Sequence, residues 1–194
     1  LILEEGEVPF ADIVGRLLSN QNQLFSEPIN GVVYLKDQEL VEGMIKTVQT
    51  DLTNLQSPYL SGILDKFISS DFLPLVQMSR YCPYSCSFCV SGKTRGKLRG
   101  FPMDMIKEEI TFISKTYADR PHFALQVADE NFGSNRKQVD EFCEKIAPLD
   151  VLWYTAGVRV RNVDKELIRK MKESGCTTIY YGIESGSAKM LKIM

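Results

Sequence analysis

Three of the chain's five cysteines lie within eight consecutive positions, in the segment CPYSCSFC. These residues, Cys82, Cys86 and Cys89, have the spacing CxxxCxxC. A cysteine cluster this dense in a reducing compartment indicates metal binding or catalysis rather than disulfide bonding. Structural zinc usually takes four ligands, whereas three thiolates on one loop can hold three irons of a [4Fe–4S] cluster and leave the fourth iron open. The spacing therefore favours an iron–sulfur site over a zinc site.

A zinc site would need a fourth ligand from elsewhere in the chain. The candidates are Cys143, Cys176 and His122, which is the only histidine. Cys143 shares an apolar helix face with Val139 and Ile146, and Cys176 begins a segment that we expect to form a buried strand. Because unpaired cysteine is among the most buried residue types, both are predicted to be core residues. His122 precedes an expected strand and is predicted to be an ordinary loop histidine.

The elements that position the cysteines follow from the apolar pattern after about residue 74. Short apolar runs predict four strands, at residues 75–78, 123–128, 151–158 and 177–183. Helical periodicity predicts three helices between them, two of which Asp104 and Asp164 are placed to cap, and a fourth helix is expected near Ser187. Four strand–helix units predict an α/β fold with a parallel sheet, a partial (β/α) barrel about half as large as a closed one.

The polar residues of interest directly follow these strands. The cysteine loop comes after the first strand, ADENF (128–132) after the second and GIESG (182–186) after the fourth. Because the carboxyl ends of parallel strands meet at one edge of a sheet, we expect these segments to lie near one another.

The first 70 residues have a different pattern. LIL at the start reads as a strand stub, residues 10–18 have the periodicity of an amphipathic helix with Pro9 near its start, and GVVYL (31–35) predicts a short strand. Residues 51–62 are rich in turn formers and indicate a linker. We therefore divide the chain into residues 1–51, a linker at 52–70 and a main domain at 71–194.

Composition narrows the possible functions. A formal charge of −2 gives no basic surface of the kind that binds nucleic acid, so no nucleic-acid partner is expected. No apolar run approaches the roughly 18 to 20 residues of a membrane-spanning helix, and no signal peptide opens the chain, so we expect a cytoplasmic protein. The chain starts without methionine and ends in SAKMLKIM without a helix stop, so we expect a piece of a longer protein.

The cysteine motif and its surroundings resemble a known family. SRYCPYSCSFCV, with Phe88 before the last cysteine, is similar to the motif of the radical S-adenosylmethionine (radical SAM) superfamily. Further segments resemble the subgroup of that superfamily that contains a cobalamin-binding domain: ADENFGSNRKQ, VRVRNVDKELIRKMKESGC, YGIESGSAKML, SPYLSGILD and EEGEVPFADIV. The resemblance implies the first half of a radical SAM barrel, preceded by the tail of a flavodoxin-like cobalamin-binding domain.

The resemblance also implies a reaction. Cys82, Cys86 and Cys89 would hold a [4Fe–4S] cluster whose open iron binds S-adenosylmethionine (SAM) through its amino and carboxylate groups. An electron from a donor such as flavodoxin or ferredoxin would cleave SAM to methionine and a 5′-deoxyadenosyl radical, which attacks an unknown small-molecule substrate. Methyl transfer, cyclisation or rearrangement are the outcomes known in this class. Cobalamin is implied for the longer protein, although no histidine that could bind cobalt lies before residue 122.

Residues after the second and third strands would contact SAM. By resemblance, Asp129, Glu130 or Asn131 would bind its amino group, and the alternative is a turn that caps the next helix, for which Asn135 is also suited. Arg159 would bind the carboxylate, because a guanidinium can pair with a carboxylate through two hydrogen bonds. If the strand continued, Arg161 would share its face and could serve instead, or either side chain could simply meet solvent.

Residues near the fourth strand and the cysteines complete the predicted site. Glu184 and Ser185 would contact the ribose hydroxyls, with Gly182 and Gly186 allowing close backbone approach, and the alternative for Glu184 is a favourable charge at a helix N-terminus. Phe88 would lie beside the cluster or the adenine, unless it is a core aromatic residue.

Two other functions fit parts of the pattern. A methylthiotransferase acting on RNA also has CxxxCxxC with a nearby arginine, and TRGKLR (94–99) is faintly similar to that family. A zinc-stabilised, non-catalytic α/β module would need a fourth ligand close to Cys82 and would not respond to SAM.

Overall fold

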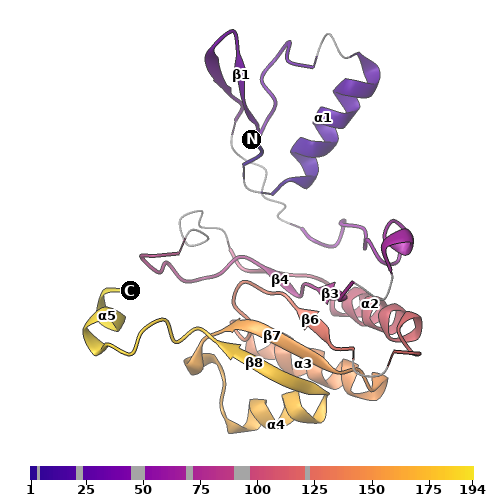
Figure 1. The fold of residues 1–194 in the computed structure, drawn as a ribbon, viewed down its shortest axis with the longest axis vertical. Helices are drawn as coiled ribbons and strands as arrows, with labels where there is room; N and C mark the ends of the chain where they lie inside the picture. Colours follow the sequence, from indigo (N-terminus) through magenta and orange to yellow (C-terminus); the bar gives the residue numbers. More distant parts are fainter. Residues whose placement is uncertain (4, 21–23, 45–50, 69–71, 90–96, 121–122) are drawn as a thin grey trace. The chain divides into compact units, whose positions relative to one another are not determined.

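The structure is a computed structural model that describes residues 1–3, 5–20, 24–44, 51–68, 72–89, 97–120 and 123–194. It divides into two compact units, Leu1–Thr50 and Asp51–Met194, which are treated separately below (Figure 1). This division falls one residue before the end expected for the first segment. The assignment of residues 1–51, 52–70 and 71–194 to a cobalamin-type remnant, a linker and a barrel domain stays a prediction. His122 and residues 94–96 of TRGKLR lie outside the described residues.

The described residues of the first unit form one α-helix and one hairpin. Helix α1 (Glu7–Ser19) has Pro9 in its first turn, as expected, and strands β1 (Val33–Lys36) and β2 (Glu39–Glu42) pair antiparallel. The two residues between the strands have φ of 50° and 66°, the left-handed conformation that tight hairpin turns require. The expected strand at the start of the chain is a single bridge between Ile2 and Val32.

The second unit is an α/β structure around a four-stranded parallel sheet (Figure 1). The strand order is β3-β6-β7-β8, with all neighbouring pairs parallel. The strands are β3 (Leu75–Val76), β6 (Leu125–Val127), β7 (Trp153–Val158) and β8 (Cys176–Tyr181). The helices are α2 (Met103–Thr116), α3 (Arg136–Ile146), α4 (Lys165–Glu173) and α5 (Ala188–Ile193). The predicted α/β fold with alternating strands and helices is confirmed.

Shorter elements connect these strands and helices. Strand β4 (Ser79–Arg80) pairs antiparallel with β5 (Arg99–Gly100), on either side of the cysteine loop. The described residues also form three 3-10 helices: η2 (Asp65–Phe67), η3 (Ala147–Leu149) and η4 (Val160–Asn162). No helix among the described residues is long and apolar enough to span a membrane.

The core lies between the sheet and helices α2, α3 and α4. Trp153 at the start of β7 is fully buried, with Phe142 of α3 packed edge-on against it at 5.1 Å between ring centroids. Its indole Nε1 donates to the carbonyl of Ser174 at 3.0 Å, so the polar edge of the ring is satisfied. Burial alternates along β6 and β7, so Leu125, Val127 and the indole face the helices. Cys143 is buried in this core, as expected.

The residues that cap the N-termini of three helices are those expected from the sequence, and the cap of a fourth helix is not. Asn135, Asp164 and Ser187 are the N-caps of α3, α4 and α5, each accepting a backbone N–H three residues on. The prediction for Asp104 is wrong, because Pro102 occupies the N-cap position of α2. Asp104 lies in the first turn instead, where its carboxylate accepts a hydrogen bond from Lys145.

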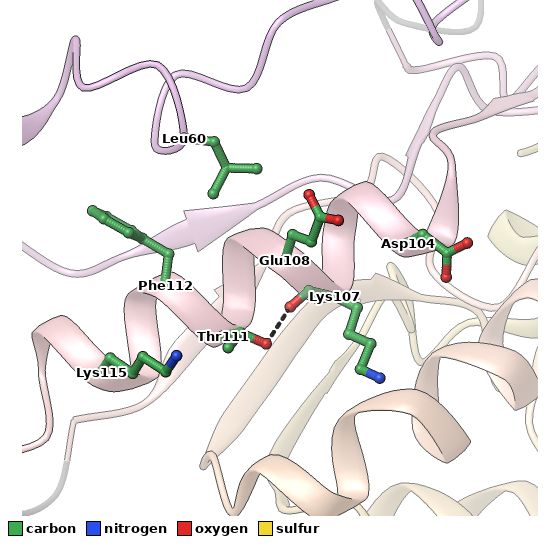
Figure 2. A pocket seen from close by; sticks show the side chains of 7 residues that line it. All are labelled: Leu60, Asp104, Lys107, Glu108, Thr111, Phe112 and Lys115. Atoms are coloured by element: carbon green, nitrogen blue, oxygen red, sulfur yellow. Dashed lines mark hydrogen bonds between the residues drawn. The ribbon is translucent and has the colours of Figure 1, made fainter.

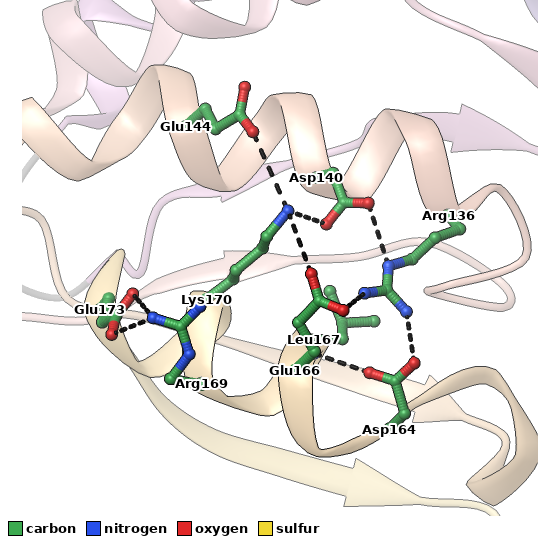
Figure 3. A network of polar contacts seen from close by, with 9 residues as sticks. All are labelled: Arg136, Asp140, Glu144, Asp164, Glu166, Leu167, Arg169, Lys170 and Glu173. Carbon is green, nitrogen blue, oxygen red and sulfur yellow. Dashed lines mark hydrogen bonds and ion pairs between the residues drawn. The ribbon is translucent and has the colours of Figure 1, made fainter.

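Helices α3 and α4 are also joined by charged side chains (Figure 3). Arg136 on α3 pairs with its neighbour Asp140 at 3.0 Å and with Asp164, the N-cap of α4, at 2.8 Å. Lys170 on α4 returns to Asp140 at 2.9 Å. These side chains are partly exposed, so each pair contributes little stability, but together they fix the relative position of the two helices.

The fourth strand expected at residues 177–183 forms as β8, but the expectation that it is buried is wrong. Strand β8 ends at Tyr181, and most of its residues are exposed. Within the described residues β8 has a neighbour on one side only, which is β7. Cys176 at its start is therefore only partly buried rather than a core residue.

Candidate functional site

The three clustered cysteines lie on the loop between β4 and β5, near the carboxyl end of β3. Cys82, Cys86 and Cys89 are all partly buried and none forms a disulfide. The backbone N–H of Cys89 donates to the carbonyl of Cys86 at 3.1 Å, which turns the end of the motif back on itself. Among the described residues, no three His, Cys, Asp or Glu side chains gather closely enough to hold a single metal ion.

The remaining two cysteines have a different chemical environment. Burial raises the pKa of the Cys143 thiol, and burial raises that of Cys176 to about 11. A raised pKa disfavours the thiolate, the form that metal ligation needs. Cys143 is thus the packing residue expected from the sequence, whereas Cys176 is only partly buried.

Asp129, at the carboxyl end of β6, fixes the segment that leads into the cysteine loop. One carboxylate oxygen accepts from the backbone N–H groups of Met78 at 2.7 Å and Ser79 at 3.0 Å, and the other accepts from the Ser79 hydroxyl at 2.7 Å. The side chain of Gln138 adds a hydrogen bond to the Met78 carbonyl at 2.8 Å. Burial raises the pKa of Asp129, although its hydrogen bonds oppose that shift. Both oxygens of this carboxylate are thus already engaged.

Glu130 is the exposed carboxylate of the predicted group. The residue as a whole is exposed, while its carboxylate is partly buried against the cysteine loop and accepts the backbone N–H of Cys82. Partial burial raises its pKa, which this hydrogen bond and the nearby Arg99 oppose. Binding of the SAM amino group by Asp129, Glu130 or Asn131 stays a prediction, and the geometry leaves Glu130 best exposed for it.

Asn131 and Arg159 both reach the cysteine motif. The Asn131 amide Nδ2 lies 3.4 Å from the Cys82 Sγ, and the Arg159 Nη1 lies 3.5 Å from the Cys86 Sγ. The Arg159 guanidinium is stacked over the Tyr84 ring, 4.0 Å from its centroid. The expectation that Arg159 and Arg161 share a strand face is wrong, because β7 ends at Val158 and a 3-10 helix follows.

Glu184 and Ser185 lie on the loop between β8 and α5 and are bonded mainly to their own neighbours. The Ser185 hydroxyl accepts the backbone N–H of Ser187 at 3.1 Å. Glu184 has φ of 62°, and its carboxylate folds back so closely that a Cβ on Gly182 would lie 2.8 Å from it. Contact of these residues with a ribose stays a prediction, as does contact of Phe88 with the cluster or adenine.

Phe88 is not a core residue. It lies between Cys86 and Cys89 with 49% of its surface exposed, so the alternative of a buried aromatic is wrong. The neighbouring Ser87 instead connects the loop to the end of α5, since its backbone N–H donates to the carbonyl of Met194 at 3.3 Å.

Sequence reasoning missed two residues of this site, Tyr84 and Asn162. The Tyr84 hydroxyl donates to the Asn162 Oδ1 at 3.4 Å, and the Asn162 Nδ2 donates to the Asn131 Oδ1 at 3.0 Å. Tyr84 could have been noticed because it lies inside the cysteine motif. Asn162 gives no such signal, because its partners lie 31 and 78 positions away in the sequence.

A groove on α2 is separate from this site (Figure 2). It has a volume of about 510 Å³, is open to solvent, and its lining includes Leu60, Lys107 and Phe112. None of the cysteines or predicted cofactor-binding residues lines it.

The family model of the Radical SAM superfamily matches residues 76–194. This range includes the whole cysteine motif and all of the four-stranded sheet except the first residue of β3. The chain therefore belongs to the Radical SAM superfamily. The resemblance inferred from CxxxCxxC and its surrounding segments is confirmed.

Individual relatives include methyltransferases. The chain is 29% identical over 196 residues to an uncharacterized methyltransferase of Pyrococcus horikoshii, covering 98% of this chain and 41% of the relative. It is 32% identical over 136 residues to the cobalamin-dependent radical SAM methyltransferase TokK of Streptomyces tokunonensis, covering 66% of this chain and 19% of the relative. The chain spans less than half the length of these curated relatives.

A solved structure shares the fold. The cobalamin-dependent S-adenosylmethionine radical enzyme OxsB, with aqua-cobalamin and S-adenosylmethionine bound, matches with a TM-score of 0.69 at 21% identity. The match covers 97% of this chain and 28% of the OxsB chain. This likeness supports the predicted fold, a partial (β/α) barrel of the radical SAM type.

Proposed function

We propose that Cys82, Cys86 and Cys89 bind a [4Fe–4S] cluster and that the surrounding strand ends bind SAM. The observation that carries the proposal is the placement of three unpaired, partly buried cysteines at the carboxyl end of a parallel sheet, within the region that matches the superfamily. Cysteine sulfur is the usual ligand of iron–sulfur clusters, so the donor set fits this group. When bound, such a cluster supplies the electron that cleaves the sulfonium of SAM to methionine and a 5′-deoxyadenosyl radical.

The residues of this chain have distinct tasks in the proposal. Asp129 holds the backbone of Met78 and Ser79, and therefore fixes where the cysteine loop starts. Glu130 is an exposed residue whose carboxylate lies beside the loop, and it would accept further hydrogen bonds from the ammonium of SAM. Glu184 and Ser185 would meet the ribose hydroxyls from the neighbouring loop. These roles orient SAM and limit the access of water to a reactive radical.

For the full-length protein, we propose cobalamin-dependent methyl transfer to a small molecule. The names of two relatives support this choice, since one is a methyltransferase and the other a cobalamin-dependent radical SAM methyltransferase. Cobalamin binding is assigned to the full-length protein and not to residues 1–51 alone, because that segment contains no histidine. A reductant such as flavodoxin or ferredoxin, and a cytoplasmic location, belong to the same proposal.

The response to SAM tests this function. The full-length protein is reconstituted anaerobically with iron and sulfide, reduced, and examined by electron paramagnetic resonance with and without SAM. We expect the signal of a reduced [4Fe–4S] cluster that changes shape when SAM is added, together with release of methionine and 5′-deoxyadenosine. A colourless, zinc-containing protein without a cluster signal would instead support the non-catalytic module.

Cobalamin binding separates the two enzyme functions. The absorption spectrum of the full-length protein, titrated with hydroxocobalamin, is expected to show bound cobalamin. A protein that forms the cluster and cleaves SAM but does not bind cobalamin would favour the methylthiotransferase acting on RNA.

A further inference from the structure

Four polar side chains from three parts of the chain form a connected network around two of the cluster cysteines. We propose that Asn131 and Arg159 donate N–H hydrogen bonds to the iron-bound sulfurs of Cys82 and Cys86, and that this network raises the reduction potential of the cluster. The inference rests on the proposed function, since it needs the cluster to be present. It assigns these two residues a task that does not depend on SAM.

The Asn131 amide is held in one orientation. Only 5% of the residue is exposed, its Nδ2 lies 3.4 Å from the Cys82 Sγ, and its Oδ1 accepts from the Asn162 Nδ2 at 3.0 Å. A flipped amide would direct its oxygen at the sulfur and its NH2 group at another NH2 group. Both contacts would then be lost, so the hydrogen-bond pattern requires that Asn131 present a donor to Cys82.

Asn162 is oriented in turn by the backbone of Phe132. The Asn162 Nδ2 lies 3.5 Å from the Phe132 carbonyl, which can only accept, so the Nδ2 faces Asn131 and the Oδ1 accepts from the Tyr84 hydroxyl at 3.4 Å. Gly133 makes this approach possible, because a Cβ there would lie 3.2 Å from the Asn162 Cβ, and its φ is 86°. The donor that faces Cys82 is therefore fixed through Asn162, whose other end contacts Tyr84 of the cysteine motif.

Arg159 is positioned by the same tyrosine. Its guanidinium carbon lies 4.0 Å from the centroid of the Tyr84 ring, and its Nη1 lies 3.5 Å from the Cys86 Sγ. A cation stacked on an aromatic face is stabilised electrostatically, and more so when partly removed from water. Tyr84 thus contacts one donor directly and the other through Asn162: its ring lies under Arg159, and its hydroxyl bonds Asn162, which holds Asn131.

Hydrogen bonds to cluster sulfurs and nearby positive charge change the reduction potential in a known direction. Reduction adds negative charge to the cluster, so N–H donors and a guanidinium beside its sulfurs stabilise the reduced form more than the oxidised form. Removal of either donor should therefore lower the midpoint potential. Arg159 carries both a donor and a full charge, so its loss should have the larger effect.

A redox titration of the reconstituted full-length protein without SAM tests the inference. Arg159→Met keeps an apolar stem over Tyr84 but removes the charge and the donor, and Asn131→Ala removes the amide. We expect Arg159→Met to change the ratio of reduced to oxidised cluster at a fixed potential by about tenfold, which is about 59 mV for one electron. Asn131→Ala should shift the potential the same way by less, and Arg159→Lys should restore part of the loss.

Two further variants separate an electronic role from a structural one. Tyr84→Phe keeps the ring under Arg159 and removes only the hydroxyl, so we expect the smallest negative shift. Asn135→Ala removes the cap of α3, which accepts from Gln138 at 3.3 Å and does not touch the network, so it should lower stability without moving the potential. If Arg159→Met or Asn131→Ala fails to take up a cluster, the midpoint potentials of Tyr84→Phe and Arg159→Lys test the inference instead, and unchanged potentials in both would contradict it.

Distinct results would contradict the two proposals. If the wild-type protein forms a cluster but Arg159→Met and Asn131→Ala keep its potential, the network inference is wrong and the proposed function stands. The same conclusion follows if the variants change only the affinity for SAM, or if Asn135→Ala shifts the potential equally. If the wild-type protein forms no cluster, both proposals fail.

Discussion

The cysteine loop between β4 and β5 and the loop after β8 are supported in very different ways. The cysteine loop is fixed by residues distant in sequence: Asp129 bonds Ser79 across 50 positions, and Tyr84 bonds Asn162 across 78. The hydrogen bonds of Ser185 to Ser187 and Ile183, and the close approach of Glu184 to Gly182, instead join residues two positions apart. The first loop is therefore defined by the packed fold of residues 51–194. The second extends from β8, which has one strand neighbour within the described part of the chain.

The largest expected effect is the difference in the free energy of unfolding between removing the carboxylate of Asp129 and removing that of Glu184. Asp129→Ala would leave the buried N–H groups of Met78 and Ser79 without their acceptor, at a cost of about 1–3 kcal/mol for each unsatisfied group. Glu184→Ala removes an exposed side chain and should change the free energy of unfolding by less than about 0.5 kcal/mol. Urea denaturation of the full-length protein measures both, and equal losses would contradict the contrast.

A smaller effect is expected at Gly157, where β7 passes the strand end that carries Glu130. Its φ is 71°, and a Cβ would lie 3.0 Å from the Glu130 backbone oxygen. Gly157→Ala should therefore cost about 1–3 kcal/mol through backbone strain. Gly15→Ala is the matched control, because it lies inside α1 with nothing within 4 Å of the added Cβ, and it should stabilise by about 0.5–1 kcal/mol. A neutral Gly157→Ala would show that β7 is not held against Glu130.

The smallest effect is a pH dependence at the first loop. Burial raises the pKa of Asp129 in the folded protein above its usual value of 3.8, so the native state holds this proton more tightly than the unfolded chain does. Its contribution to stability is present below pH 3.8 and is lost as pH rises through the raised pKa. Asp129→Asn lacks this loss, so its melting temperature relative to wild type should rise between pH 4 and 7.

Asp104→Asn provides a control with the opposite sign. The hydrogen bond from Lys145 lowers the pKa of Asp104, so this carboxylate contributes stability above its unfolded pKa that is lost at acid pH. The variant's melting temperature relative to wild type should fall as pH rises from acid values to about pH 4, and should then stay constant up to pH 7. Identical trends for the two variants would contradict the assignment of the Asp129 shift to burial.

Patterns that repeat along the sequence predicted the fold well. Alternating apolar runs and helical periodicity located four parallel strands, and local chemistry identified Asn135, Asp164 and Ser187 as positions where helices begin. The prediction that Asp104 caps its helix was wrong because a proline two residues earlier occupies the cap position. The burial predicted for β8 was wrong because a run of apolar residues predicts a strand but not how many neighbours that strand has.

The site residues that belong to a sequence motif could be predicted, whereas those that only folding brings together could not. The three cysteines have a spacing that implies their chemistry. Arg161 was paired with Arg159 because the strand was expected to continue, and η4 removes that relation. The engagement of both Asp129 oxygens, and the path from Tyr84 through Asn162 to Asn131, depend on contacts between strand ends that local sequence does not encode.

The most direct test of the central claim is the iron and sulfide content of cysteine variants. The full-length protein is reconstituted anaerobically as wild type, as Cys86→Ala and as Cys176→Ala, and each is analysed for iron and acid-labile sulfide per chain. The account predicts four irons and four sulfides per site in the wild type and in Cys176→Ala, with most of this content lost in Cys86→Ala. Retention of the full cluster by Cys86→Ala, or its loss from Cys176→Ala alone, would contradict the account.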